Sequence, residues 1–106
     1  MKSYKLEDMT RGWIVGNFDP SVYKTEECEV GFKVYKAGDR EVAHHHKIAT
    51  EITVVISGRI RMKDKEWSSG DIIVIDPGES TEFEALTDAS NLVIKLPGAT
   101  DDKYID

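Results

Sequence analysis

Three consecutive residues, His44, His45 and His46, are all the histidines of this chain, and Glu51 follows five residues after the last of them. Successive side chains of a β-strand point to opposite faces, so a strand here would place His44 and His46 together and His45 on the other face. Two imidazoles and a nearby carboxylate are ligands that first-row transition metals accept. We therefore identify His44, His46 and Glu51 as a candidate metal site.

The elements that must hold these residues are short β-strands. Between them lie segments rich in Gly, Pro, Asp or Ser, among which the polar run KDKE at 63–66 is predicted to turn. No window sustains a helical apolar period, although residues 4–11 could form a turn or two. This pattern predicts an all-β sandwich or barrel, formed by one domain over residues 1–106. The expected strands are 13–18, 28–36, 42–46, 51–57, 59–63, 71–75, 80–86 and 91–96.

Two of these strands, 51–57 and 71–75, are apolar on both faces. A strand buried on both sides in so small a protein implies a second sheet within the domain and a partner that covers the outside. The alternative is that one face packs on the N-terminal segment. A homodimer is the expectation.

Composition restricts the class of partner. The chain carries 14 Lys and Arg against 20 Asp and Glu, a formal net charge of -6, which argues against binding to nucleic acid. Cys28 is the only cysteine, so no intrachain disulfide and no thiolate metal site is expected. The sequence shows neither a signal peptide nor a run long enough for a membrane helix. A cytoplasmic protein that binds a small molecule is the expectation.

The spacing around the histidines resembles the first motif of the cupin superfamily. Gly38, five residues, His44, one residue, His46, four residues, Glu51, six residues and Gly58 agree with that motif at every position. The segment 70–85, GDIIVIDPGESTEFEA, resembles the second motif. The resemblance, which covers nearly half of the chain, is to a small single-domain cupin. It implies a double-stranded β-helix, or jelly-roll barrel, with motif 1 at 38–58 and motif 2 at 70–85.

The second motif departs from the metal-binding pattern. Where metal-holding cupins usually have a further histidine, this chain has Thr81, whose hydroxyl is a weak neutral ligand. Inward-pointing Thr81, Phe83 and Ala85 would leave the neighbouring acids outside. A register slip or bulge would instead turn Glu82 into the cavity, and Glu79 in the preceding turn is the other substitute.

The resemblance leaves several functions open. In one, His44, His46 and Glu51 hold Fe, Mn, Ni or Zn, and a small oxygenated molecule occupies the open positions, as in a dioxygenase or an isomerase. The run AHHHK also resembles that of small metal-free cupins that isomerise sugars attached to nucleotides, where His44 or His46 would be the catalytic acid or base. Against this, the sequence shows no obvious cationic cluster for a diphosphate. The third possibility is a non-catalytic module that binds a small ligand.

Other residues have weaker signals. His45 is expected to be exposed or at an interface. Trp13 and Trp67 are expected to pack in the core or an interface, although either could stack on a sugar or close the barrel mouth. The acidic clusters, Glu26-Glu27-Glu29 and Asp101-Asp102, are expected to be solvated. One or two of five polar residues are candidates to enter the cavity and bind a carboxylate or phosphate, namely Lys33, Tyr35, Lys47, Arg59 and Arg61. Arg59 and Arg61 alternate with apolar residues and are expected on a solvated outer face.

Overall fold

The computed structural model describes residues 1–98 and 101–106, and most of its regular structure is β-strand. Two short 3-10 turns, η1 (Leu6–Asp8) and η2 (Thr10–Gly12), come first. No helix in this described part of the chain is long and apolar enough to cross a membrane. The strands are β1 (Trp13–Val15), β2 (Glu29–Tyr35), β3 (Arg40–His45), β4 (Thr50–Ser57), β5 (Arg59–Met62), β6 (Lys65–Ser68), β7 (Ile72–Ile75), β8 (Thr81–Ala85), β9 (Ala89–Leu96) and β10 (Tyr104–Ile105).

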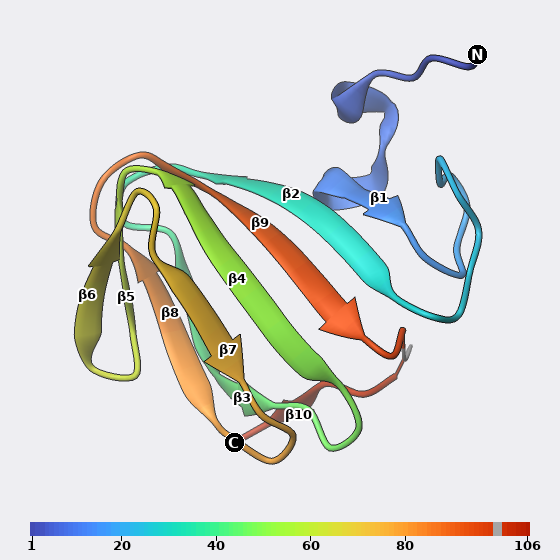
Figure 1. Cartoon of the computed structure of the whole chain (residues 1–106). Helices are drawn as coiled ribbons and strands as arrows, with labels where there is room; N and C mark the ends of the chain where they lie inside the picture. Colours follow the sequence, from blue (N-terminus) through green and yellow to red (C-terminus); the bar gives the residue numbers. More distant parts are fainter. Residues whose placement is uncertain (99–100) are drawn as a thin grey trace.

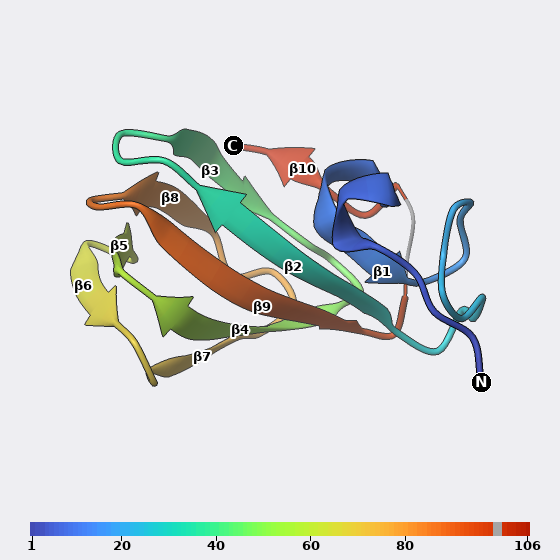
Figure 2. The same ribbon diagram turned by 90° about the horizontal axis from the view of Figure 1, so that it is seen from above.

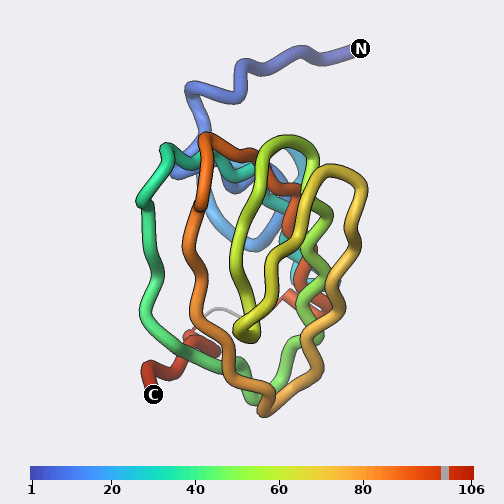
Figure 3. The backbone as a smooth tube through the Cα atoms, turned by 90° about the vertical axis from the view of Figure 1, so that its left-hand side faces the viewer, coloured from blue at the N-terminus to red at the C-terminus, as the bar shows by residue number. Residues whose placement is uncertain are grey.

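Within the described residues the strands form two five-stranded sheets, with the orders β1-β2-β9-β4-β7 and β10-β3-β8-β5-β6. All pairings within the sheets are antiparallel. Figures 1 and 2 show the two sheets facing one another. From β2 to β5, and again from β6 to β9, each connection carries the chain from one sheet to the other, and Figure 3 shows this winding. The all-β barrel expected from the sequence is confirmed.

The hydrophobic core lies between the sheets at the end where β4 and β8 meet the connections to β5 and β9. Because alternate residues of each strand point inward, single side chains from several strands meet there. Tyr35 and Trp67 pack against this cluster from its edge. The cluster consists of Val55, Ile60, Met62, Ile73, Ile75, Phe83, Ala85 and Ala89.

Two strands were not predicted. The sequence interpretation placed Lys65 and Glu66 in a turn, but they belong to β6. Lys63 and Asp64 both have positive φ, 54° and 58°, and Met62 pairs with Lys65, so two residues are enough to reverse the chain. The two-residue strand β10 pairs with β3, and a strand so short leaves no periodic pattern in the sequence.

The outer surface of the first sheet is apolar. Residues directly opposite each other in antiparallel strands share a face, so the pairing of β2, β9, β4 and β7 produces rows of side chains. Ile72 and Val74 in these rows are 64% and 55% exposed. We call this surface the outer apolar face; its rows are Val30, Ile94, Ile52, Val74 and Phe32, Leu92, Val54, Ile72.

Candidate functional site

A cavity of about 370 Å³ lies between the sheets and contains all three predicted metal ligands in its lining. β3 and the residue after it contribute His44 and His46, and β4 contributes Glu51. Glu51 lies at the inner face because it alternates with the outward-facing Ile52. The cavity therefore brings together the three side chains that the motif spacing singled out.

The three histidines separate as strand alternation predicts. His44 and His46 are 8% and 5% exposed and line the cavity. His45 points elsewhere: its Nδ1 lies 2.7 Å from Oδ1 of Asp106, and its ring stacks on Tyr104 of β10. The C-terminal strand therefore covers His45, which takes no part in the cavity.

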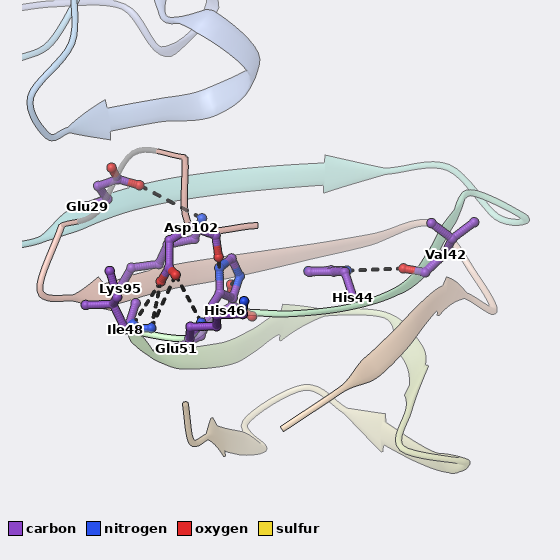
Figure 4. Close-up of polar contacts among 10 residues, drawn as sticks. Glu29, Val42, His44, His46, Ile48, Glu51, Lys95 and Asp102 are labelled. Atoms are coloured by element: carbon purple, nitrogen blue, oxygen red, sulfur yellow. Dashed lines mark hydrogen bonds and ion pairs between the residues drawn. The ribbon is translucent and has the colours of Figure 1, made fainter. Parts of the chain in front are cut away.

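Both cavity histidines are held through Nδ1. His44 bonds to the backbone carbonyl of Val42 at 3.1 Å, and His46 bonds to that of Asp102 at 2.7 Å (Figure 4). A carbonyl oxygen only accepts, so Nδ1 carries a proton and donates it; in a neutral ring bonded in this way, Nε2 keeps its lone pair. Metal-ligating histidines are commonly oriented by such a bond on the far nitrogen.

Two polar atoms of the cavity lining are buried and, among the described residues, without a hydrogen-bond partner: Nε2 of His46 and Oδ1 of Asn91. Oε1 of Glu51 lies 3.7 Å from Nε2 of His46. Burial, and secondly the positive charge of Lys95, lower the pKa of His46. The neutral ring is therefore favoured, and its lone pair is available to a ligand or a proton.

The residues present fit a divalent metal ion in part. In the described part of the chain, no group of three or more His, Cys, Asp and Glu side chains is assembled as a ready metal cluster. The rings of His44 and His46 are perpendicular, at 89°, with centroids 5.5 Å apart. Nε2 of His46 and the carboxylate of Glu51 are nevertheless a pair of donors that a transition metal can bind. His44 lines the same cavity.

Asp102 supports this site, and the sequence interpretation missed it. Asp102 was expected in a solvated acidic cluster, but it is 3% exposed. Its carboxylate accepts hydrogen bonds from the backbone N–H groups of Lys47, Ile48 and Ala49 at 3.0 to 3.2 Å. Burial raises the pKa of this carboxyl, but the three N–H donors outweigh burial and hold the pKa below its usual value. Asp102 thus clamps the loop after His46 while its own carbonyl orients the ring.

Thr81 occupies the inward position that the sequence predicts, opposite His44 in the register of β3 and β8. Its hydroxyl accepts from the N–H of Lys63 at 3.2 Å and donates to the carbonyl of Glu82 at 2.8 Å. These bonds engage the proton and one of the two lone pairs of the hydroxyl in a turn contact, while Thr81 also lines the cavity.

Neither substitute acid is directed at the histidines. Glu82 accepts a hydrogen bond from the N–H of Asp64 at 3.0 Å. Glu79 accepts one from the N–H of Asp76 at 3.0 Å, and its second oxygen pairs with Lys63 at 3.2 Å. Both carboxylates are engaged by turns, but Glu82 lines the cavity, whereas Glu79 is absent from its lining.

The cavity also contains a group of cations that the sequence interpretation did not recognise. Inner-face residues of β2, β9 and β4 form a row in which Lys95 lies directly between Glu29 and Glu51. Glu29, expected to be solvated, is 7% exposed. Lys33 and Tyr35 line the cavity, whereas Arg59 and Arg61 are exposed elsewhere. The expectation from the sequence that no cationic cluster is present was therefore wrong. Four cations line the cavity: Arg11, Lys33, Lys95 and Lys103.

A signal for this row was present in the sequence. Lys95 is the one charged residue of strand ASNLVIKL, and it alternates with Val93 and Asn91 on the inner face. Glu29 and Lys33 alternate with Gly31 in the same way. Charges at inward positions of otherwise apolar strands indicate a polar cavity.

This architecture is the double-stranded β-helix of the cupins, as the two motifs predicted. An uncharacterised conserved protein with a double-stranded β-helix domain from Klebsiella pneumoniae matches with a TM-score of 0.69 and 18% identity, over 76% of this chain and 71% of that one. KdgF from Halomonas sp. matches with a TM-score of 0.65 and 20% identity, over 74% of each chain. The chain therefore has the fold of a small cupin.

The bacterial pirin YhhW from Escherichia coli, in complex with nickel(II), matches with a TM-score of 0.69 and 15% identity, over 83% of this chain and 39% of that one. No protein-family model matches the sequence, and no curated protein matches it. At these identities the likenesses establish the fold, and the activity must be argued from the cavity.

Proposed function

We propose that this protein is a metal-binding cupin in which His44, His46 and Glu51 hold a divalent transition metal, Fe, Mn, Ni or Zn. A small oxygenated molecule would bind beside the ion. The carrying observation is Nε2 of His46, which is buried, unpartnered among the described residues, and 3.7 Å from the Glu51 carboxylate. When bound, the ion would polarise a carbonyl or hydroxyl group at its open positions.

The chain's own residues prepare this chemistry. The carbonyls of Val42 and Asp102 keep the proton of each ring on Nδ1, so both Nε2 atoms present lone pairs. The lowered pKa of His46 keeps its ring neutral, as a metal ligand requires. The nickel(II) complex of the similarly folded pirin supports the choice of a transition metal.

A metal-free isomerase or ligand-binding module is the second candidate, and one observation favours it. Lys95 lies beside Glu51 in the register of β9 and β4, so a resident positive charge already neutralises part of the carboxylate. His46 would then transfer protons through Nε2. A volume of about 370 Å³ is near the lower end of the range for small-molecule sites, which favours a small substrate over a nucleotide-sugar.

Metal content distinguishes these candidates. Untagged protein is dialysed against a chelator, incubated separately with Fe(II), Mn(II), Ni(II) and Zn(II), and measured by plasma mass spectrometry. We expect about one ion per chain in the wild type and about 100-fold weaker binding in His46→Gln, because a ligand is lost. His45→Gln is the matched control and should bind as the wild type does, since His45 lies outside the cavity.

Two results would contradict the metal proposal: no ion retained by the wild type with any of the four metals, or equal retention by His46→Gln. Glu51→Gln, which is nearly isosteric, serves as a second test if His46→Gln fails to fold. Circular dichroism of each variant establishes folding before the metal is measured.

We also propose that the outer apolar face pairs with a second copy of the chain. Its two rows carry no charged side chain, so a twofold-related copy presents a complementary surface without any need for matched charges. Apolar area removed from water contributes about 25 cal/mol per Å². A homodimer would therefore cover Ile72 and Val74, which are exposed in the single chain.

Light scattering after size exclusion tests the homodimer. The wild type should have twice the mass of the chain, and Val74→Lys should be monomeric because a buried ammonium in the interface lacks a partner. Val42→Lys is the matched control, since Val42 is 66% exposed on β3 in the other sheet. A monomeric wild type, or a dimeric Val74→Lys, would refute the assignment.

A further inference from the structure

Two of the four cations in the cavity lining lie over the ring of one tryptophan, Trp13. Trp13 of β1 lies opposite Gly31 of β2, and a Cβ at Gly31 would lie 2.8 Å from the indole ring. The missing side chain therefore lets the ring lie against the inner face of the sheet. The ammonium groups of Lys33 and Lys95 lie 4.9 and 5.0 Å from the ring centroid. We call Trp13, Lys33 and Lys95 the lysine rim.

Of the four cations in the cavity lining, only Lys95 has an ion-pair partner among the described residues, although Glu41, Glu51 and Glu82 line the same cavity. Burial lowers the pKa of Lys33; Glu41 opposes this, and the cations Arg11, Lys95 and Lys103 add to it. Nζ of Lys33 has a neutral partner, the carbonyl of Arg11, at 2.6 Å. Like charges that converge in a partly buried site repel one another, and a bound anion removes that cost. In a chain of net charge -6, this concentration of cations is a local feature.

The rim is connected to the histidine end of the cavity through Lys95. Nζ of Lys95 lies 3.9 Å from Oε1 of Glu29, and the two side chains are 15% and 9% exposed. Glu29 and Glu51 flank Lys95 in the register on either side. The histidine end of the cavity therefore lies next to the rim, because Glu51 adjoins Lys95 in the register and its Oε1 is 3.7 Å from Nε2 of His46.

We propose that the lysine rim binds the carboxylate of a small hydroxy or keto acid, whose oxygenated carbons extend toward His46 and Glu51. The inference rests on the proposed function for the second half of this statement, because the histidine end is where the oxygenated group is received. Lysine supplies a charge-assisted hydrogen bond to a carboxylate, and Trp13 supplies a face for the carbon chain.

Gluconate and sorbitol form a matched pair of probes, because they share a six-carbon polyol chain and differ in the carboxylate. Malate is a second acid, with acetate as its short counterpart. Binding is measured by calorimetry and by thermal shift on the chelator-treated full-length protein, and again with each metal restored. We expect gluconate or malate to bind, sorbitol not to bind, and added salt to weaken the binding.

Variants assign the binding to the rim. Lys33→Met should weaken binding of the acid about tenfold, since one charge-assisted bond is lost. Lys95→Arg should retain it, because the charge next to Glu29 is kept. Lys47→Met is the matched control: Lys47 lies 4.2 Å from the ring centroid of Tyr104 and is absent from the cavity lining.

The rim proposal would be overturned if sorbitol bound as well as gluconate, if neither gluconate nor malate bound at millimolar concentration, or if Lys33→Met bound like the wild type. If the acid binds in a lysine-dependent way to a protein that retains no metal, the rim proposal stands and the metal proposal is rejected. If the protein retains metal but binds neither acid, the metal proposal stands and the rim proposal is rejected.

Discussion

Replacing Asp102 by alanine is expected to lower the free energy of unfolding by about 3 kcal/mol. The substitution leaves the N–H groups of Lys47, Ile48 and Ala49 without the carboxylate that accepts their hydrogen bonds. The C-terminal segment would loosen, and with it the carbonyl that orients His46. Urea unfolding followed by circular dichroism gives the stability, and metal affinity should fall by about tenfold or more.

The pH dependence of the same variant tests the cause. An aspartate in an unfolded chain has a pKa of about 3.9, and the pKa of Asp102 in the folded protein is lower. The stabilising contribution of the carboxylate is therefore complete above the unfolded value and is lost as the pH falls through the folded value. The stability difference between the wild type and Asp102→Ala should be constant near neutrality and shrink in strong acid.

Two further variants serve as controls. Asp102→Asn keeps one acceptor oxygen and should lie between the wild type and Asp102→Ala. Glu27→Ala removes an exposed acid and should change the unfolding free energy by less than about 0.5 kcal/mol. If Asp102→Ala were as stable as Glu27→Ala, the clamp on residues 47–49 would have no energetic importance.

Gly58→Ala is expected to cost about 3 to 5 kcal/mol of unfolding free energy. Gly58 lies in the connection from β4 to β5, where the chain passes from one sheet to the other, and its φ is 80°. A Cβ there would stand 2.2 Å from the carbonyl oxygen of Asp88 and 2.8 Å from Cα of Ala89. Asp88 lies in the connection from β8 to β9 and Ala89 begins β9, so the two crossings of the barrel would be forced apart.

Gly38→Ala separates the two contributions to this cost. Gly38 also has a positive φ, 94°, but a Cβ there meets no described atom within 4 Å outside its chain neighbours. Gly38→Ala should therefore lower the free energy of unfolding only by the backbone strain, about 1 to 2 kcal/mol. Thermal or chemical unfolding of the two variants side by side checks the difference. Equal losses would mean that the contact with residues 88–89 is unimportant.

The local part of the site was predictable from the sequence. Alternation along a strand depends on neighbouring residues alone, so the shared face of His44 and His46 and the inward position of Thr81 could be inferred before any contact was known. The two glycines of the first motif also act locally, since both turns require a positive φ. The number of sheets followed from strands that are apolar on both faces.

The sequence by itself therefore determined the barrel, the strand faces and the three residues proposed as metal ligands, because these depend on periodicity and short spacings. The tertiary structure alone decided which distant residues support them. His46 and Asp102, 56 positions apart, meet because β10 pairs with β3. Lys95 reaches Glu51 because β9 pairs with β4. Strand register brings such residues together, and register is set by the packing of the whole sheet.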